Sequence, residues 1–167
     1  MSCCAPCSVA AINKLKSENY DFTVLFFNPN IFPEQEYQKR LDEQIEFCKK
    51  MDVKYEVGNY DHSAWVQETR GLEDEPERGS RCEKCFRHRF IFGAKWASKH
   101  GYNAITSVFG VSPHKDQDQV NRAAADLGIE YIDFGFDYTP QAGMYRQKYC
   151  GCEFSIRTSC HETRNQG

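Results

Sequence analysis

Apolar positions in the first half of the chain follow two different periods, which predict strands and helices in turn. The run "DFTVLFFNPN" from Asp21 is apolar and ends in turn-forming residues, which indicates a buried strand of a parallel sheet. Apolar side chains at helical spacing continue to Met51 and predict a helix in which Pro33 takes the first position. "VKYEVG", from Val53, predicts the next strand, and a first helix is predicted over about residues 8–18.

The second half of the chain shows the same alternation. "GLEDEPERGS", from Gly71, is rich in acidic and turn-forming residues and predicts an exposed loop. A helical pattern then covers residues 81–100 and stops at Gly101, a typical C-terminal cap. "NAITSV" and "IEYIDF" predict two more strands, with a short helix over about residues 116–127 between them.

This alternation of strands and helices predicts an α/β fold, because successive parallel strands need helical crossovers. We expect a three-layer sandwich with a mainly parallel sheet, a Rossmann-like arrangement of the nucleotide-hydrolase or PP-loop type. A chain of 167 residues is long enough for one well-packed domain. We therefore expect a single metal-binding, catalytic domain over residues 1–155 and a polar, flexible tail over residues 156–167.

Composition narrows the class of protein. Charged residues make up 27% of the chain and hydrophobic residues 40%, which is typical of a globular protein, and no apolar run reaches the roughly 18 residues of a membrane helix. No secretory signal pattern is present, so we expect a cytoplasmic protein without a membrane partner. The net charge of -3 argues against a uniformly basic surface, yet five basic residues face one acidic residue between Arg81 and Lys95. This segment suits either phosphate contacts or a solvated helix face.

The nine cysteines are the unusual feature, because thiols in a reducing cytoplasm seldom form disulfides. Seven of them form three groups: Cys3, Cys4 and Cys7; Cys82 and Cys85; Cys150 and Cys152. All three groups fall in or beside loops expected at the carboxyl ends of strands, where α/β folds bind ligands. Metal binding is therefore the leading interpretation. Cys48 lies in a helical pattern and is expected to be an ordinary buried residue, and Cys160 in the polar tail receives no role.

The number of clustered thiols points to more than one metal site. A cubane iron–sulfur cluster takes four thiolates and so does a structural zinc, so seven exceed either need. Neighbouring side chains of an extended segment point to opposite sides, which would let Cys3 and Cys4 serve different sites. We expect the cluster ligands to be Cys3, Cys82, Cys85 and Cys150. A second, catalytic metal would then be held by Cys4, Cys7 and Cys152.

Five blocks of sequence, in this order along the chain, resemble the QueH-type epoxyqueuosine reductases. They are "CCAPCS" from Cys3, "FFNPNIFPEQEYQKR" from Phe26, "RCEKCFRHR" from Arg81, the Ser, Pro, His and Lys of residues 112–115, and "YRQKYCGCEFS" from Tyr145. The resemblance covers residues 3–155. It implies the last step of queuosine biosynthesis, in which epoxyqueuosine at the wobble position of tRNA is reduced to queuosine. It also implies a [4Fe-4S] cluster with an adjacent mononuclear iron, and no cobalamin.

The implied reaction defines what the site must supply. Loss of the epoxide oxygen as water consumes two electrons and two protons, which acid–base groups alone cannot provide. A low-potential cluster can deliver single electrons, and an iron with an open position can polarise the epoxide oxygen. The partners would be tRNA carrying epoxyqueuosine in its anticodon and an electron donor that the sequence does not identify. Candidate proton donors are Tyr145, Tyr149, His114 and Asp116.

Substrate contacts are expected from polar and aromatic residues close to the cysteines or in the basic segment. The candidates are Asn28, Asn30, Tyr37, Arg40, Arg81, Arg87, Lys115, Tyr145, Arg146 and Gln147. Each also has a structural interpretation: Asn28 and Asn30 could shape a turn, and Tyr37 and Arg40 could form a packed pair.

Two other classes of protein fit the same residues. One is a different iron–sulfur enzyme that acts on a nucleobase or small molecule, such as a desulfidase. The other is a zinc-stabilised RNA-binding module, which would leave several thiols unused.

Overall fold

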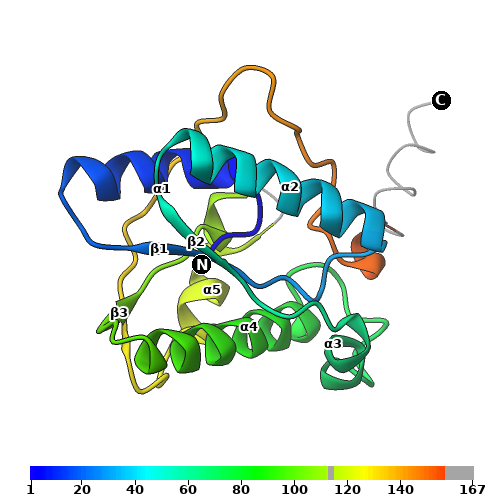
Figure 1. Cartoon of the computed structure of the whole chain (residues 1–167). Helices are drawn as coiled ribbons and strands as arrows, with labels where there is room; N and C mark the ends of the chain where they lie inside the picture. The colour runs from blue at the N-terminus through cyan, green and yellow to red at the C-terminus, as the bar shows by residue number, and fades with distance from the viewer. Residues whose placement is uncertain (113–114, 157–167) are drawn as a thin grey trace.

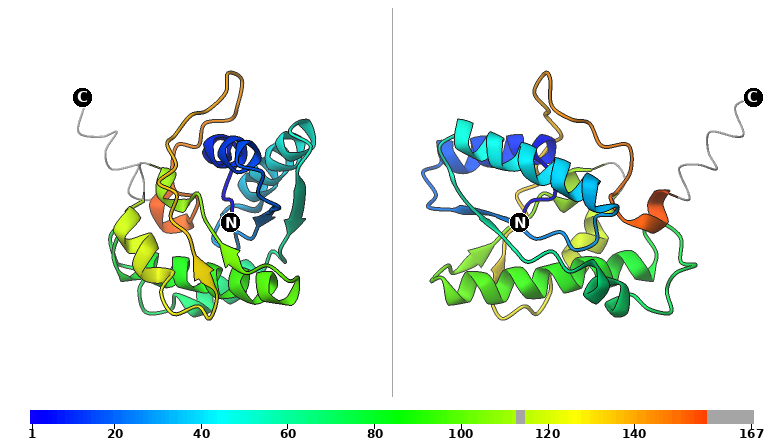
Figure 2. Two further views of the ribbon diagram at one scale, coloured as in Figure 1. Left: turned by 90° about the vertical axis from the view of Figure 1, so that its left-hand side faces the viewer. Right: turned by 45° about the vertical axis from the view of Figure 1, so that its right-hand side comes forward.

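The computed structural model describes residues 1–112 and 115–156, in which helices cover both faces of a layer of parallel strands. In chain order, the elements are α1 (Ala5–Ser17), β1 (Thr23–Phe26), α2 (Glu34–Lys50), β2 (Lys54–Val57), α3 (His62–Glu68), α4 (Ser80–Lys99), β3 (Ala104–Ile105), the 3-10 turn η1 (Phe109–Val111), α5 (Gln117–Ala123) and β4 (Glu130–Tyr131). Helices α1 and α2 cover one face of the strands, and α4 covers the other, with α3 packed beside one end of α4 (Figures 1 and 2). The three-layer α/β fold predicted from the sequence is confirmed.

All strand pairing in the described part of the chain is parallel. β1 pairs with β2, with Thr23 opposite Lys54, and β3 pairs with β4, with Ala104 opposite Glu130. The strands are shorter than the apolar runs predicted, and they form two pairs instead of one continuous ladder. The runs overestimate strand length because their ends, such as the Asn-Pro-Asn turn after β1, leave the sheet to reach the helices.

The first two residues join the two pairs of strands. Ser2 forms a parallel bridge with Phe26, and its N–H donates to the Leu25 carbonyl at 2.9 Å. On the other side the Val108 N–H donates to the Met1 carbonyl at 3.1 Å. The spatial order is therefore β2, β1, Met1–Ser2, β3, β4, with the earliest segment in the centre, as in Rossmann-like folds.

The helices follow the predicted pattern with one addition. α4 ends before Gly101, whose φ of +79° is the left-handed conformation expected after a helix. α3 was not predicted, although Asp61 supplies a recognisable cap by accepting from the Ala64 N–H at 2.9 Å. Every helix in the described residues is too short or too polar to cross a lipid bilayer.

The core consists of apolar clusters on the two sides of the strands. One lies between α1 and α2 and includes Cys48, which is fully buried and receives a hydrogen bond from the Gln44 amide at 3.3 Å. The prediction that Cys48 is a buried core residue is confirmed. A second and larger cluster contains Phe86, Phe90 and Phe109 and includes the cysteines of the first group. Cys160 and most of the predicted tail lie outside the described residues.

Candidate metal centre

The first group of cysteines surrounds the start of α1. Cys4 is the N-cap of this helix and Cys7 lies in its first turn. The sulfur atoms of Cys3, Cys4 and Cys7 all lie within 4.8 Å of one another, and all three side chains are buried. Such a group has the donor atoms and spacing to hold a metal ion.

The expectation that Cys3 and Cys4 point to opposite sides is wrong. Their sulfur atoms are 4.0 Å apart. The alternation of an extended strand does not apply, because the chain bends at Cys3 between the central strand position and α1. The division of the seven cysteines between a cluster and a second metal stays a prediction.

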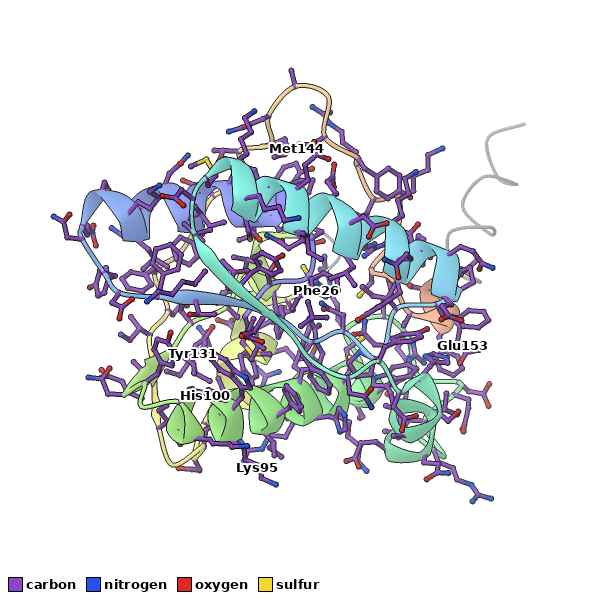
Figure 3. The ribbon with its side chains drawn as sticks, viewed as in Figure 1. Phe26, Lys95, His100, Tyr131, Met144 and Glu153 are labelled. Carbon is purple, nitrogen blue, oxygen red and sulfur yellow. The ribbon has the colours of Figure 1, made fainter. Side chains whose placement is uncertain are left out.

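The two other pairs of cysteines, which are far apart in the sequence, come together in space, and we call them the second group. Cys82 and Cys85 lie in the first two turns of α4, and Cys150 and Cys152 lie on the loop before the end of the described chain. All four line one small cavity together with Trp65 and Arg89. Glu153, next to Cys152, lies beside α3 (Figure 3), where its carboxylate is 3.4 Å from His62 Nε2.

The two groups of cysteines adjoin. Cys82 packs against the apolar cluster that contains Cys3, Cys4 and Cys7. Lys115 connects them as well, because its Nζ donates to Cys3 Sγ at 3.4 Å while its side chain lines a second small cavity with Cys82, Cys150 and Cys152. The fold thus gathers the seven cysteines at the carboxyl ends of the strands.

The thiols of the first group share one negative charge. Hydrogen bonds from the Cys4 and Cys7 thiols, and more weakly the charge of Lys115, hold the pKa of Cys3 well below its usual range. The same interactions with Cys3 raise the pKa values of Cys4 and Cys7. Without metal, Cys3 is therefore the thiolate of this group.

Burial governs the thiols of the second group. It raises the pKa of Cys82 to about 11 and also raises the pKa values of Cys85 and Cys150. These thiols keep their protons at neutral pH, so a metal must displace protons to bind them.

We expect metal affinity to rise steeply with pH. Each displaced thiol proton contributes about a tenfold gain in affinity per pH unit below its pKa. Anaerobic competition titrations with Co²⁺ at pH 6.5, 7.5 and 8.5 measure this slope. An affinity that does not change over this range would show that the bound ion displaces no thiol protons.

Buried polar atoms with no partner also surround the cysteines. Four such atoms line the two small cavities: Asn30 Oδ1, Trp65 Nε1, Arg81 Nε and Gln119 Oε1 have no hydrogen-bond partner among the described residues. Each buried group without a partner costs about 1–3 kcal/mol. Two of them are N–H donors, which suit the sulfur atoms of a thiolate-bound metal centre. The residues present therefore fit such a centre.

Arg40 and Tyr37, two predicted substrate contacts, lie inside the protein. The Arg40 side chain is 2% exposed, and its Nε lies 2.7 Å from Glu36 Oε1. Its Nη atoms donate to the carbonyls of Cys150 at 3.2 Å and Tyr149 at 3.3 Å. Tyr37 stacks on the Tyr60 ring at 4.0 Å. Arg40 therefore holds the backbone of the Cys150 loop, and contact of either residue with substrate remains a prediction.

The two predicted asparagines have different surroundings. Asn28 Nδ2 donates to the Ser2 carbonyl at 3.0 Å, and Asn28 Oδ1 accepts from Arg89. Both its polar atoms are thus used in fixing the central segment. Asn30 faces the cysteine cavity with its oxygen unpartnered, which makes it the better placed of the two to contact a bound group.

The basic segment does not form a continuous surface. Arg81 is 2% exposed, and its Nη1 donates to the carbonyls of Leu72 and Glu73 at 3.1 Å. Arg87 donates to the Ala123 carbonyl at 3.2 Å and so caps the end of α5. Lys95 does project outward from α4 (Figure 3). The expected phosphate contacts by Arg81 and Arg87 remain predictions, and the packing of both side chains offers them no support.

The remaining predicted residues lie on or near the segment before Cys150, which passes over α1 and α2 (Figure 1). Tyr145 Oη donates to Glu36 Oε2 at 2.9 Å, and Gln147 Nε2 donates to the Tyr145 carbonyl at 2.9 Å. Arg146 is exposed. Their contacts with substrate stay predictions.

Two of the candidate proton donors serve structural roles. Asp116 caps α5 by accepting from the Gln119 N–H at 2.7 Å. Tyr149 Oη donates to the Phe32 carbonyl at 2.7 Å, and burial raises the pKa of Tyr149 to about 12. His114 lies outside the described residues.

Sequence reasoning missed Trp65 and the role of Arg89. Trp65 belongs to α3, for which no helix was predicted, so nothing placed it near the cysteines. Arg89 had a usable signal, because it follows Cys82 and Cys85 at helical spacing and so shares their face of α4. It was counted among surface charges because charge in a sequence does not reveal burial.

Fold and site define an α/β protein of Rossmann-like topology with a buried group of cysteines at the carboxyl ends of its strands. The family model described as "Epoxyqueuosine reductase QueH" matches residues 1–158. The chain therefore belongs to the epoxyqueuosine reductase QueH family of oxidoreductases, as the sequence blocks indicated.

Individual relatives agree with this assignment. The chain is 38% identical to the epoxyqueuosine reductase QueH of Haemophilus influenzae, over 95% of this chain and 71% of the relative. It is 37% identical to the protein of the same name from Histophilus somni, over 93% of this chain and 70% of the relative. The protein of the same name from Acinetobacter baylyi is 34% identical, over 99% of this chain and 83% of the relative.

Proposed function

We propose that this protein reduces epoxyqueuosine in tRNA to queuosine, and that its seven grouped cysteines hold a [4Fe-4S] cluster and an adjacent iron. Membership of the family supports the reaction. The observation that most directly supports the cofactors is the pair of adjoining cysteine groups. One is the buried group of Cys3, Cys4 and Cys7, and the other lines two small cavities with unpartnered polar atoms. More thiols gather there than one zinc or one cubane requires.

The chain's own residues prepare this site for electron and proton transfer. When bound, the cluster would supply single electrons and the iron would act as a Lewis acid toward the epoxide oxygen. Burial by itself would lower the pKa of Lys115, but charge on Cys3, Cys150 and Cys7 together raises the pKa above its usual range, so Lys115 Nζ keeps a proton beside the cysteines. Trp65 and Phe86 are 1% and 2% exposed and exclude bulk water from the cavities that they line.

The substrate side of the proposal involves tRNA. Arg146, exposed near the Cys150 loop, is the predicted residue with a guanidinium free to approach a phosphate. Asn30 faces the cavity and is placed to contact the modified base. We place the reaction in the cytoplasm, with an external one-electron donor.

Metal content and tRNA turnover test the proposal together. Anaerobically purified protein should contain about five iron and four sulfide atoms per chain, as expected for a cubane and one further iron. With a chemical reductant it should convert epoxyqueuosine in tRNA to queuosine, measured by mass spectrometry of digested nucleosides.

Two other results would each favour a different function. About one zinc without sulfide, after attempted cluster reconstitution, would indicate the RNA-binding module. A loaded cluster without turnover of epoxyqueuosine tRNA would indicate another iron–sulfur enzyme.

A further inference from the structure

Arg89 is a buried cation without an acidic side chain to balance it. Its side chain, on α4, is 1% exposed. Nε donates to the Phe27 carbonyl at 3.2 Å, Nη2 donates to Asn28 Oδ1, and the guanidinium lies 3.6 Å from the Phe109 ring centre. Among the residues with described positions, no carboxylate forms an ion pair with it. A buried charge in this situation is strongly unfavourable unless an anion lies nearby.

The anions near Arg89 are the cysteine sulfurs. Its side chain lines the cavity formed with Cys82, Cys85, Cys150 and Cys152. Burial lowers the pKa of Arg89, whereas charge on the nearby sulfurs of Cys85, Cys3 and Cys150 favours its protonated form. The charge of the guanidinium is thus directed at the place where thiolates gather.

The other buried arginines beside this site are balanced differently. Arg40 pairs with the Glu36 carboxylate at 2.7 Å. Arg81 donates to three carbonyls of the loop before α4. Arg89 donates to two neutral acceptors, the Phe27 carbonyl and Asn28 Oδ1, and no acidic side chain among the described residues balances its charge.

We propose that Arg89 is the built-in counter-charge of the anionic metal centre and raises its reduction potential. The inference rests on the proposed function, because it requires a thiolate-bound redox centre. An electron from the external donor makes that centre more negative, and a fixed positive charge close by stabilises the reduced form. Arg89 is therefore a positioning residue that tunes the centre and does not touch the substrate.

The variants Arg89→Met and Arg89→Lys test whether the positive charge of Arg89 raises the reduction potential of the metal centre. Methionine keeps an apolar chain against Phe109, and lysine keeps the charge. With the centre reconstituted, we expect Arg89→Met to lower the equilibrium constant for one-electron reduction by at least about tenfold, which is about 59 mV in a dye-mediated titration. Arg89→Lys should recover most of this loss.

Metal-free protein is the control for folding. Arg89→Met loses the hydrogen bonds to the Phe27 carbonyl and Asn28 Oδ1, so its urea midpoint should fall by an amount that still leaves a cooperative unfolding transition. If metal-free Arg89→Met is folded but cannot be reconstituted with iron and sulfide, that loss of the metal centre also supports the role of Arg89 as its counter-charge.

Three results would overturn the inference. They are an unchanged potential in loaded Arg89→Met, no recovery in Arg89→Lys, or loss of the cooperative urea transition in metal-free Arg89→Met, which would indicate that Arg89 is needed for folding itself. A parent protein without iron and sulfide would overturn the proposed function as well, whereas a loaded parent with an unchanged Arg89→Met variant overturns this inference alone.

Discussion

Replacing Cys85 by alanine is expected to remove the metal centre and to lower epoxyqueuosine reduction by more than about 100-fold. Cys85 is buried in the second cysteine group and lines the cavity shared with Cys150 and Cys152. Its loss removes one of the four sulfurs that line the cavity where we expect the cluster to bind. Iron and sulfide analysis, the visible absorption of the cluster and the tRNA assay would each report the change.

Cys48→Ala is the matched control. Cys48 is also buried, but it lies between α1 and α2, away from the grouped cysteines. This variant should keep its iron, sulfide and activity. Full iron and sulfide content in Cys85→Ala, with circular dichroism showing a folded protein, would contradict the assignment of Cys85 as a ligand.

The second large effect is expected from one added methyl group, in Gly151→Ala. Gly151 separates Cys150 from Cys152 and has a φ of +119°, which alanine rarely adopts. A Cβ there would lie 2.9 Å from Arg40 Nη1 and 3.2 Å from Ile31 Cγ1. The backbone strain costs about 1–3 kcal/mol. The clash also pushes Arg40 away from the Cys150 carbonyl. We expect activity and cluster content to fall by at least about tenfold.

Gly143→Ala is the control that introduces backbone strain without displacing a neighbouring side chain. Gly143 has a φ of +84°, but a Cβ there would meet nothing within 4 Å. Alanine at this position destabilises the backbone conformation but moves no cysteine, so the variant should retain its metal centre. Equal losses of iron in both variants would mean that general destabilisation, and not the geometry of the Cys150 loop, controls metal retention.

Sequence periodicity predicted most of the fold because the helices and strands here carry strong local signals. α4 has an apolar stripe and ends before Gly101, so its bounds were predicted to within a residue. α3 has only two turns, too few for a period to be visible, and its Asp61 cap was the remaining signal. Met1 and Ser2 act as the central strand through pairing with Leu25 and Val108, which are distant in sequence and leave no local pattern.

The candidate site was predictable in its membership and less so in its geometry. Spacing and topology together brought the seven cysteines to one edge of the strands. The side chains of Cys3 and Cys4 lie on the same side because the chain bends at Cys3, where it leaves the central strand position. The side-chain alternation of an extended strand therefore predicts their directions wrongly. Arg81 and Arg89 were grouped with surface charges, because their burial depends on the loop carbonyls and sulfurs that tertiary structure places around them.

The position of Cys48 makes it an internal reference for chemical labelling. Its sulfur is sealed between α1 and α2 and held by Gln44, whereas Cys82 is partly exposed at the edge of the cysteine cavity. A thiol reagent would reach Cys82 once the proposed metal centre has been removed, but it would reach Cys48 only when the helices separate. Peptide mapping after a short alkylation pulse therefore distinguishes loss of the cofactor from loss of the fold in the same sample.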